Sequence, residues 1–405
     1  MKEQFYADGF DIVPMDSMAE VCVINSCTVT ADGDRKTKQA ARRARAANET
    51  AVIAVTGCFP QTSPEDIGEL LPEADIIMGT KNRARLAEHC KTVLSAGGRI
   101  VDIEKHSKDD KFERADFRRF SERTRAFVKI EDGCDRMCAY CIIPKARGSV
   151  RSKPISEIKD EMVNLAEAGH REVVLSGINL SSYGRDINSS LVEAVETASG
   201  SMARVRLGSL EPELITDGDL DKLAKINGFC PQFHLSLQSG SDSVLKRMKR
   251  RYTSGDYAEL AAKMRAKFQN AAITTDIMVG FPGETDEEFE ETMRFVRTIG
   301  FAKVHVFSYS KRQGTAAASM DEQVSEPVKK ERNKKLSELC ALERERYIKS
   351  CAGKTFTVLT EESGAGYTEN YIKVKLPPTA KKNELVRVIL GDYDKEADIC
   401  TAEMI

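Results

Sequence analysis

The protein has 405 residues, of which 41% are hydrophobic and 31% charged, and its formal net charge is -2. These values are typical of a globular protein and exclude a disordered chain, a fibrous chain and a globally basic nucleic-acid binder. The length exceeds the size at which one hydrophobic core usually stops growing, so we expect two or three domains.

Targeting signals are not recognisable in the sequence. No stretch reaches the roughly 18 to 20 apolar residues that a membrane helix needs, and the N-terminus MKEQFYADGF lacks the order of a signal peptide. We therefore expect a cytoplasmic protein. It has 11 cysteines, an odd number that cannot all pair. In a reducing compartment, clustered cysteines indicate metal binding.

The first region, residues 1–104, alternates strand-like and helical patterns. The strand-like runs are VCVINSC, AVIAVTGC and DIIMGT, and helical patterns follow near 34–47, 64–71 and 82–94. This rhythm predicts a small parallel α/β domain. Residues 2–7 read as the end of a helix with no strand before it. We therefore expect that the first strand of this domain is missing from the sequence.

A polar, basic stretch at 105–124 reads as a linker, and a second domain is predicted over 125–345. Six strand-like runs, from AFVKI to KVHVFSY, alternate there with helical patterns near 155–168, 189–199, 213–226, 241–269 and 286–299. Thr285 and Glu288 form a capping-box pattern, and Gly300 is a stop signal. Six strand-helix units predict a partial β/α barrel.

The last region, residues 346–405, follows a charged amphipathic helix near 325–349. It contains the short β-rich runs TFTVLTEE, YIKVKL and LVRVIL, joined by Gly, Pro and Asn turns. These runs predict a small antiparallel β-barrel. The whole chain is thus of the α/β class, with a β-barrel at its C-terminal end.

Three cysteines, Cys134, Cys138 and Cys141, lie in the motif CDRMCAYC directly after the first predicted barrel strand. Three thiolates hold a four-iron cluster with one iron left open to a small molecule, which a closed four-cysteine site cannot do. A structural zinc site is the alternative, but zinc sites favour paired CxxC spacings with four ligands. Barrel active sites lie where strands end, which also favours the cluster.

The CxxxCxxC spacing with an aromatic residue before the last cysteine resembles the radical S-adenosylmethionine (SAM) superfamily. The resemblance implies a 4Fe-4S cluster that chelates SAM and cleaves it to a 5'-deoxyadenosyl radical. Glycines and polar residues at the other strand ends are candidate SAM contacts, because glycine allows close backbone approach; ordinary βα turns are the alternative. The candidates are Gly177, Asn179, Ser209, Glu211, Gln238, Asp276 and Gly280.

Two further cysteines, Cys27 and Cys58, each end a predicted strand of the first domain. In a parallel sheet both emerge at the same edge, close enough to share a metal cluster, although a lone cysteine is more often a buried core thiol. The motifs INSCTVT, TGCFPQTSPEDI, GCDRMCAYCIIPKARG and DIMVGFPGETDEEF together resemble the methylthiotransferase family. That resemblance implies a second 4Fe-4S cluster on three N-terminal cysteines and a C-terminal TRAM domain that grips the substrate.

The run INSCTVT followed by GDRKTKQAARRARA is most similar to the branch that acts on tRNA N6-threonylcarbamoyladenosine at position 37. The resemblance implies tRNA, an electron donor such as flavodoxin or ferredoxin, and a sulfur source as partners. The isopentenyladenosine and ribosomal-protein branches are the alternatives. Two basic runs could meet RNA phosphate, or could be solvated helix faces: Arg35, Lys36, Lys38, Arg42, Arg43 and Arg45; and Lys246, Arg247, Lys249, Arg250 and Arg251.

The family's first N-terminal cluster cysteine has no counterpart in this sequence. Cys22 precedes Cys27 in the same strand but points to the opposite face, about 16 Å away if the strand is extended. The missing first strand is where this ligand belongs. Either the true start lies upstream or the second cluster is incomplete. The incomplete set motivates a hypothesis of another class, a non-catalytic iron-sulfur protein that binds RNA.

Overall fold

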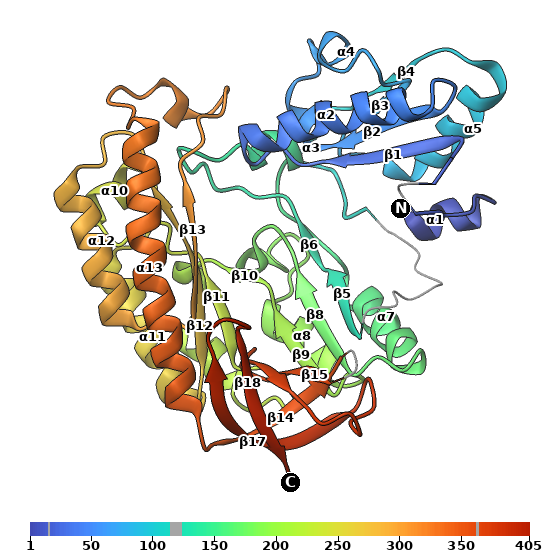
Figure 1. The fold of residues 1–405 in the computed structure, drawn as a ribbon. Coiled ribbons are helices and arrows are strands. Elements are labelled where there is room, and N and C mark those ends of the chain that lie inside the picture. Colours follow the sequence, from blue (N-terminus) through green and yellow to red (C-terminus); the bar gives the residue numbers. More distant parts are fainter. Residues whose placement is uncertain (15–16, 114–123, 362–363) are drawn as a thin grey trace. The chain divides into compact units, whose positions relative to one another are not determined.

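The computed structural model describes residues 1–14, 17–113, 124–361 and 364–405. The chain divides into two compact units, shown in Figure 1. One comprises Met1–Arg119, Gly133–Arg151 and Ser310–Ser319, and the other Phe120–Asp132, Ser152–Tyr309 and Met320–Ile405. Most of the predicted linker, residues 114–123, lies outside the described residues, and the predicted domain limits stay predictions. No helix within the described ranges is long and apolar enough to cross a membrane.

The first unit contains a four-stranded parallel sheet. Its strands lie in the order β1 (Val21–Ser26), β2 (Val52–Gly57), β3 (Ile76–Met78) and β4 (Ile100–Asp102). Strand β2 is buried along its whole length. Its alternate residues enter two separate hydrophobic clusters, Val52 and Ala54 in one and Ile53 and Val55 in the other. Both faces of the sheet are therefore covered, as a parallel sheet requires.

The first unit also contains helices. They are α1 (Lys2–Ala7), α2 (Ala31–Ala47), α3 (Cys58–Thr62), α4 (Ile67–Leu70), the 3-10 turn η1 (Arg83–Arg85), α5 (Leu86–Ala96), α6 (Ile143–Arg147) and the 3-10 turn η4 (Ala316–Ser319). Helix α2 begins before the predicted residue 34 because the Thr30 side chain caps it, accepting from the Gly33 N–H. The predicted helix at 64–71 is wrong in extent, since only Ile67–Leu70 is helical there.

The second unit carries the partial barrel, whose strands form two parallel sheets. The first sheet consists of β5 (Arg125–Lys129), β8 (Glu172–Ser176) and β9 (Arg204–Leu207). The second consists of β10 (Ser209–Leu210), β11 (Gln232–Leu235), β12 (Ala272–Val279) and β13 (Lys303–Ser308). The predicted α/β class with parallel strands is confirmed. The short strands β6 (Glu131–Asp132) and β7 (Arg151–Ser152) flank the cysteine motif in the chain.

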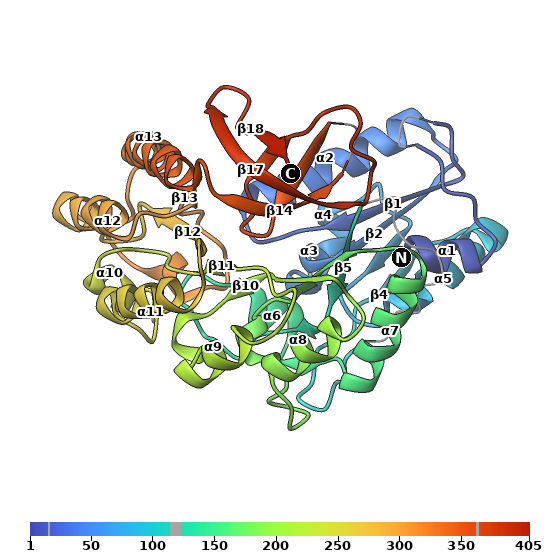
Figure 2. The ribbon, with the colours of Figure 1, turned by 90° about the horizontal axis from the view of Figure 1, so that it is seen from below.

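Helices lie in an arc outside these strands, as Figure 2 shows. They are α7 (Ile155–Glu167), α8 (Leu191–Ser199), α9 (Asp217–Leu223), α10 (Asp242–Arg247), α11 (Ser254–Lys267), α12 (Asp286–Ile299) and α13 (Glu326–Cys351), with 3-10 turns η2 (Leu180–Ser182) and η3 (Pro212–Leu214). The predicted helical stretch at 241–269 is two helices, because Lys249 has a φ of 59° and Thr253 begins a new helix with a capping box. The capping box at Thr285 and Glu288 is confirmed.

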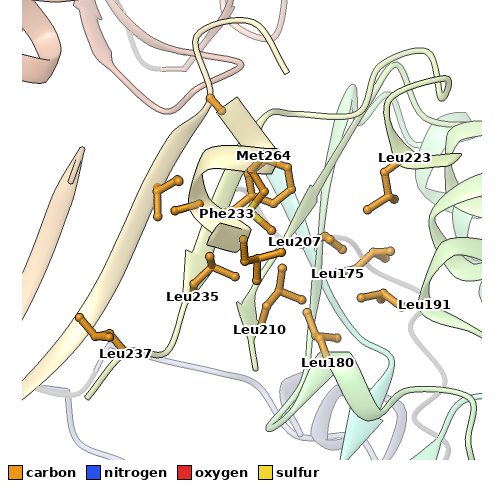
Figure 3. Close-up of a cluster of buried hydrophobic side chains, with 14 of the residues drawn as sticks. Leu175, Leu180, Leu191, Leu207, Leu210, Leu223, Phe233, Leu235, Leu237 and Met264 are labelled. Atoms are coloured by element: carbon orange, nitrogen blue, oxygen red, sulfur yellow. The ribbon is translucent and has the colours of Figure 1, made fainter. Parts of the chain in front are cut away.

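The hydrophobic core of the second unit lies between these helices and the outer face of the strands. Figure 3 shows part of this core, with leucines from several strands packed around Phe233 and Met264. Leu175, Leu207 and Leu235 are all at most 2% exposed. Burial of such side chains fixes which face of each strand points outward, and thus which face points to the barrel interior.

The C-terminal strands form a closed barrel in the order β14 (Thr355–Thr360), β15 (Ala365–Thr368), β16 (Lys373–Lys375), β18 (Ile399–Met404) and β17 (Leu385–Asp394). The predicted small barrel is therefore confirmed, but the expectation that it is wholly antiparallel is wrong. Strands β16 and β18 pair in parallel through Val374 and Cys400. A parallel closing pair removes both sheet edges without a further hairpin.

Candidate functional site

The loop that carries Cys134, Cys138 and Cys141 follows β6 in the chain and ends in α6. All three cysteines are partly exposed thiols. The Arg136 N–H donates to Cys134 Sγ, and the Ile143 N–H donates to Cys141 Sγ, each over 3.4 Å. Backbone N–H groups aimed at sulfur stabilise thiolates and tune the potential of a cluster that they hold. The donor set of this loop therefore fits an iron-sulfur cluster.

Two glycines allow the ends of this loop to meet. The Cys134 N–H donates to the carbonyl of Gly148 over 2.9 Å. Gly133 has a φ of 87°, and a Cβ there would lie 2.0 Å from the Ser149 carbonyl oxygen. A larger residue at position 133 would therefore push the two ends of the loop apart. The middle of the loop is held by the Ala317 N–H, which donates to the carbonyl of Ala139 over 2.7 Å.

Cys27 and Cys58 follow neighbouring strands of the parallel sheet. In the β1–β2 ladder Ser26 is paired with Gly57, so each cysteine comes directly after a paired residue. Both cysteines therefore leave the sheet at the same edge, which is the edge where ligands bind in open parallel sheets. Cys27 is exposed and Cys58 is buried. Cys22 lies within β1, away from this edge.

Helix α6 brings a cation to Cys58. Arg147, the last residue of α6, donates from Nε to Cys58 Sγ over 3.2 Å. The helix is held against the sheet by Thr80, whose Oγ1 donates to the Ala146 carbonyl over 2.7 Å. The loop of Cys134 and the sheet edge of Cys58 thus belong to one compact unit. Arg147 could not be singled out from the sequence, because nothing in the run IIPKARG marks one cation as the partner of a distant thiol.

The segment 310–319 supports the other side of this sheet edge. Arg312 Nη1 pairs with Asp34 Oδ2 over 2.7 Å, and Arg312 also donates to Thr28 Oγ1. The Ser310 Oγ accepts from the Ala31 N–H over 3.1 Å. These contacts fix the turn that follows Cys27. Arg312 and Ser310 could not be predicted from the sequence, because more than 270 residues separate them from this turn.

Among residues 1–14, 17–113, 124–361 and 364–405, no group of three or more His, Cys, Asp and Glu side chains is arranged to hold a single ion. The assignment of particular cysteines as cluster ligands therefore rests on their chemistry and contacts.

The strand-end residues of the second unit include a strained glutamine. Gln238 is 8% exposed, and its φ of 68° lies in the left-handed region, which is unfavourable for a residue with a side chain. Its backbone N–H donates to the Asp276 carbonyl over 2.9 Å. Its side-chain Oε1 has no hydrogen-bond partner within the described residues. A buried acceptor of this kind at a strand end fits a polar ligand.

Glycines at two other strand ends lie against glutamates. A Cβ at Gly177 would lie 2.5 Å from Glu131 Oε2, which accepts from the Asn179 N–H over 2.7 Å. Similarly, the Gly280 N–H donates to Glu284 Oε1 over 2.8 Å. Burial raises the pKa of Glu284, although Arg332 pairs with it. Glu131 is a further residue that the sequence analysis missed, because its role depends on the neighbouring strand.

Two of the remaining candidates, Ser209 and Asp276, lie within strands of the second barrel sheet. Ser209 is paired with His234 in the β10–β11 ladder. The Glu211 N–H donates to Ser181 Oγ over 2.9 Å, and the Glu211 carboxylate pairs with Arg250. Glu211 and Gln238 thus follow the strands β10 and β11, whereas the expectation that Asp276 lies at a strand end is wrong, because it lies within β12.

Several cations of the two basic runs form ion pairs within the protein. Arg250 is bound to Glu211, and Arg247 to Glu288. In the first run, Arg45 pairs with Asp75 over 2.6 Å. Arg35 and Lys36 pair with Asp32, and Arg42 pairs with Glu73, so six cations of these runs are engaged in ion pairs within the chain. Arg43, Lys246 and Arg251 remain candidates for contact with RNA phosphate.

Fold and strand-end chemistry together define a radical SAM enzyme. The profile of the radical SAM superfamily matches residues 128–296, and that of "Uncharacterized protein family UPF0004" matches residues 1–79. The structure resembles the radical SAM methyltransferase TsrM of Kitasatospora setae, with a TM-score of 0.56 and 13% identity over 91% of this chain and 70% of that one. Membership of the superfamily implies a 4Fe-4S cluster and SAM as cofactors.

Within this class, the chain belongs to the methylthiotransferase family. It is 38% identical to the "Threonylcarbamoyladenosine tRNA methylthiotransferase MtaB" of Bacillus subtilis over 91% of this chain and 85% of the relative. It is 37% identical to the MtaB protein of Thermotoga maritima over 100% of this chain and 94% of the relative. The "tRNA-2-methylthio-N(6)-dimethylallyladenosine synthase" of Clostridium novyi is 36% identical to this chain, over 87% of this chain and 80% of the relative.

Proposed function

We propose that this protein is a tRNA methylthiotransferase that adds a methylthio group to carbon 2 of N6-threonylcarbamoyladenosine at position 37, next to the anticodon. The observation that carries the proposal is the likeness of nearly the whole chain, at 34 to 38% identity, to four relatives named for threonylcarbamoyladenosine. A tRNA substrate places the reaction in the cytoplasm. These relatives match nearly the whole chain and are named as transferases, which argues against a non-catalytic RNA-binding protein.

Cys134, Cys138 and Cys141 would hold the cluster that binds SAM. When bound, such a cluster supplies the electron that cleaves SAM. The chain's own contribution is to present three thiolates from one loop and to solvate two of them with the N–H groups of Arg136 and Ile143. An external reductant, such as flavodoxin or ferredoxin, would supply the electron.

Cys27 and Cys58 would be two ligands of a second 4Fe-4S cluster, through which replacement sulfur reaches the substrate. Their common sheet edge supports this proposal, and so does the Arg147 guanidinium beside Cys58. A cation next to a thiolate favours its ionised form, which is the form that binds iron. A third ligand is not identified among the described residues, and a sulfur source is required for each turnover.

SAM would be held by Gly177, Asn179, Ser209, Glu211, Gln238, Asp276 and Gly280. The unpartnered Oε1 of Gln238 and the close backbone approach at Gly177 support this assignment. These residues would orient SAM through hydrogen bonds from a rigid sheet and exclude water from the strand ends. Two SAM molecules are consumed in the proposed reaction, one as methyl donor and one as radical source.

The dimethylallyladenosine synthases among the relatives define the second candidate function, since they are 34 to 36% identical. The deciding experiment is nucleoside mass spectrometry of tRNA from a strain that lacks this gene and carries no second such enzyme. We expect the methylthio form of threonylcarbamoyladenosine to disappear. Its undiminished presence, with loss of the methylthio form of dimethylallyladenosine, would establish the second candidate instead.

A further inference from the structure

One face of the second barrel sheet carries polar side chains on three adjacent strands. The alternate residues Phe233, Leu235, Ile273 and Ile277 enter the hydrophobic core. The residues between them therefore point to the opposite face, toward the barrel interior. In the ladders, Thr274 is paired with both His234 and Lys303, and Asp276 is paired with His305.

Hydrogen bonds order the part of this face around His234. Its Nδ1 lies 3.0 Å from Thr274 Oγ1, and its Nε2 lies 3.3 Å from Asp276 Oδ2. The rings of His234 and His305 are 6.0 Å apart. Asp276 is thereby engaged by an imidazole, which reduces the repulsion that its carboxylate would exert on a neighbouring anion.

Strand β13 carries a cation on the same face. Lys303 and His305 are exposed, and they lie two residues apart on one strand, so their Cα atoms are about 6.5 Å apart. Within the described part of the chain, Lys303 makes no ion pair, whereas Arg344, on the neighbouring helix α13, is paired with Asp398. The available positive charge of this face is therefore concentrated at Lys303.

We propose that Lys303 and His305, beside the ordered pair His234 and Asp276, form a subsite that binds the carboxylate of the threonylcarbamoyl group. This inference rests on the proposed function. The threonyl carboxylate is ionised at neutral pH, because such groups have a pKa near 3.5. A dimethylallyl group carries no charge and would gain nothing from a lysine. The subsite would thus select the nucleoside.

The chemistry of His305 supports this geometry. Burial of part of its ring lowers the pKa of His305, with Lys303 and His234 acting in the same direction and Asp276 against it. A neutral imidazole keeps one N–H to donate to a carboxylate oxygen. Lys303 would then supply the charge and His305 the directional hydrogen bond. Asp276, a proposed SAM contact, is paired with His305 in the β12–β13 ladder, so the subsite shares a row of the sheet with a proposed SAM contact.

Binding of three anticodon stem-loop RNAs to reconstituted full-length protein tests this subsite. One RNA carries threonylcarbamoyladenosine, the second its methyl ester, and the third unmodified adenosine. A hydrogen bond to a charged group is stronger than one to a neutral group, so we expect the wild type to bind the acid at least about tenfold more tightly than the ester. Lys303→Met should abolish this preference, His305→Leu should weaken it, and Lys303→Arg should retain it.

Controls separate this carboxylate from two other anions. Lys159→Met removes an exposed lysine on the outer helix α7 and should change nothing. If Lys303→Met weakened the binding of all three RNAs equally, Lys303 would contact an RNA phosphate, and the proposed subsite would be rejected. If it weakened SAM binding alone, the anion would be the SAM carboxylate, which would overturn the subsite equally.

The outcome also distinguishes this inference from the proposed function. Methylthiolation of the acid RNA by the wild type, with an unchanged preference for acid over ester in Lys303→Met, would reject the subsite and keep the function. Absence of methylthiolation of that RNA by fully reconstituted wild type would reject the function, and the subsite with it.

Discussion

The Arg147 guanidinium donates from Nε to Cys58 Sγ over 3.2 Å. This contact joins the short helix that follows Cys141 to the sheet edge that carries Cys27 and Cys58. It gives the proposed second cluster a cation beside one of its sulfurs. Charge and hydrogen bonds at the sulfurs are among the factors that set the reduction potential of a cluster.

Replacing Arg147 with glutamine should therefore shift the midpoint potential of the second cluster to more negative values. Reduction adds an electron to the cluster, and loss of a neighbouring positive charge disfavours that electron. Redox titration followed by electron paramagnetic resonance measures the shift. Arg43→Gln, on the exposed side of α2, is the matched control and should leave the potential unchanged. An unchanged potential in Arg147→Gln, with full iron content, would contradict the role of Arg147.

Replacing Cys134, Cys138 or Cys141 with alanine should abolish 5'-deoxyadenosine formation. The loop offers three thiolates, and loss of one unseats the cluster. Chromatographic assay of deoxyadenosine, together with iron and sulfide analysis, checks the result. Cys22→Ala is the matched control, because Cys22 lies within β1 and not at its end. Full turnover by any of the three loop variants would exclude that cysteine as a ligand.

Replacing Cys27 or Cys58 with alanine should separate the two halves of the reaction. SAM cleavage should persist because the loop cysteines are intact, whereas methylthio transfer should be lost with the second cluster. Iron content should fall by one cluster relative to the wild type. Product analysis of RNA by mass spectrometry, in parallel with the deoxyadenosine assay, measures both halves. Normal methylthiolation by either variant would show that the cysteine concerned is a core thiol.

The half-buried contacts of Glu288 should make stability depend on pH. Burial alone would raise its pKa, but hydrogen bonds from Arg247, Ser243 and the Thr285 N–H lower it from 4.5 to about 2. Because the folded-state pKa is the lower one, this stabilisation is complete above about pH 5 and is lost as the pH falls toward 2. After a discount for solvent screening of this partly exposed group, it amounts to roughly 1 to 2 kcal/mol at neutral pH.

Urea denaturation of wild type and Glu288→Gln at several pH values tests this linkage. Glutamine can keep the capping geometry at the start of α12, so the variant isolates the charge. The difference in the free energy of unfolding should be largest near neutral pH and should shrink on acidification. A difference that is constant with pH would show that the Glu288 carboxylate contributes no net charge interaction.

The sequence by itself determined the classes of structure and the sulfur chemistry. Strand and helix periods are local, so the parallel α/β region, the barrel and the C-terminal β-barrel could be predicted, as could the capping box of Thr285. The spacing of Cys134, Cys138 and Cys141 is also local, because one loop carries all three. The substrate branch came from resemblance alone, since no local pattern encodes a modified nucleoside.

Only the tertiary structure decided which groups meet across large separations in the chain. Arg147 beside Cys58, Arg312 beside Asp34, and Glu131 beneath Asn179 depend on strand order and helix docking, which the sequence pattern leaves open. The same holds for Lys303, whose available charge is evident only once the partners of neighbouring cations are known. Side-chain partners follow from packing in three dimensions, whereas periodicity reports only the face of each element.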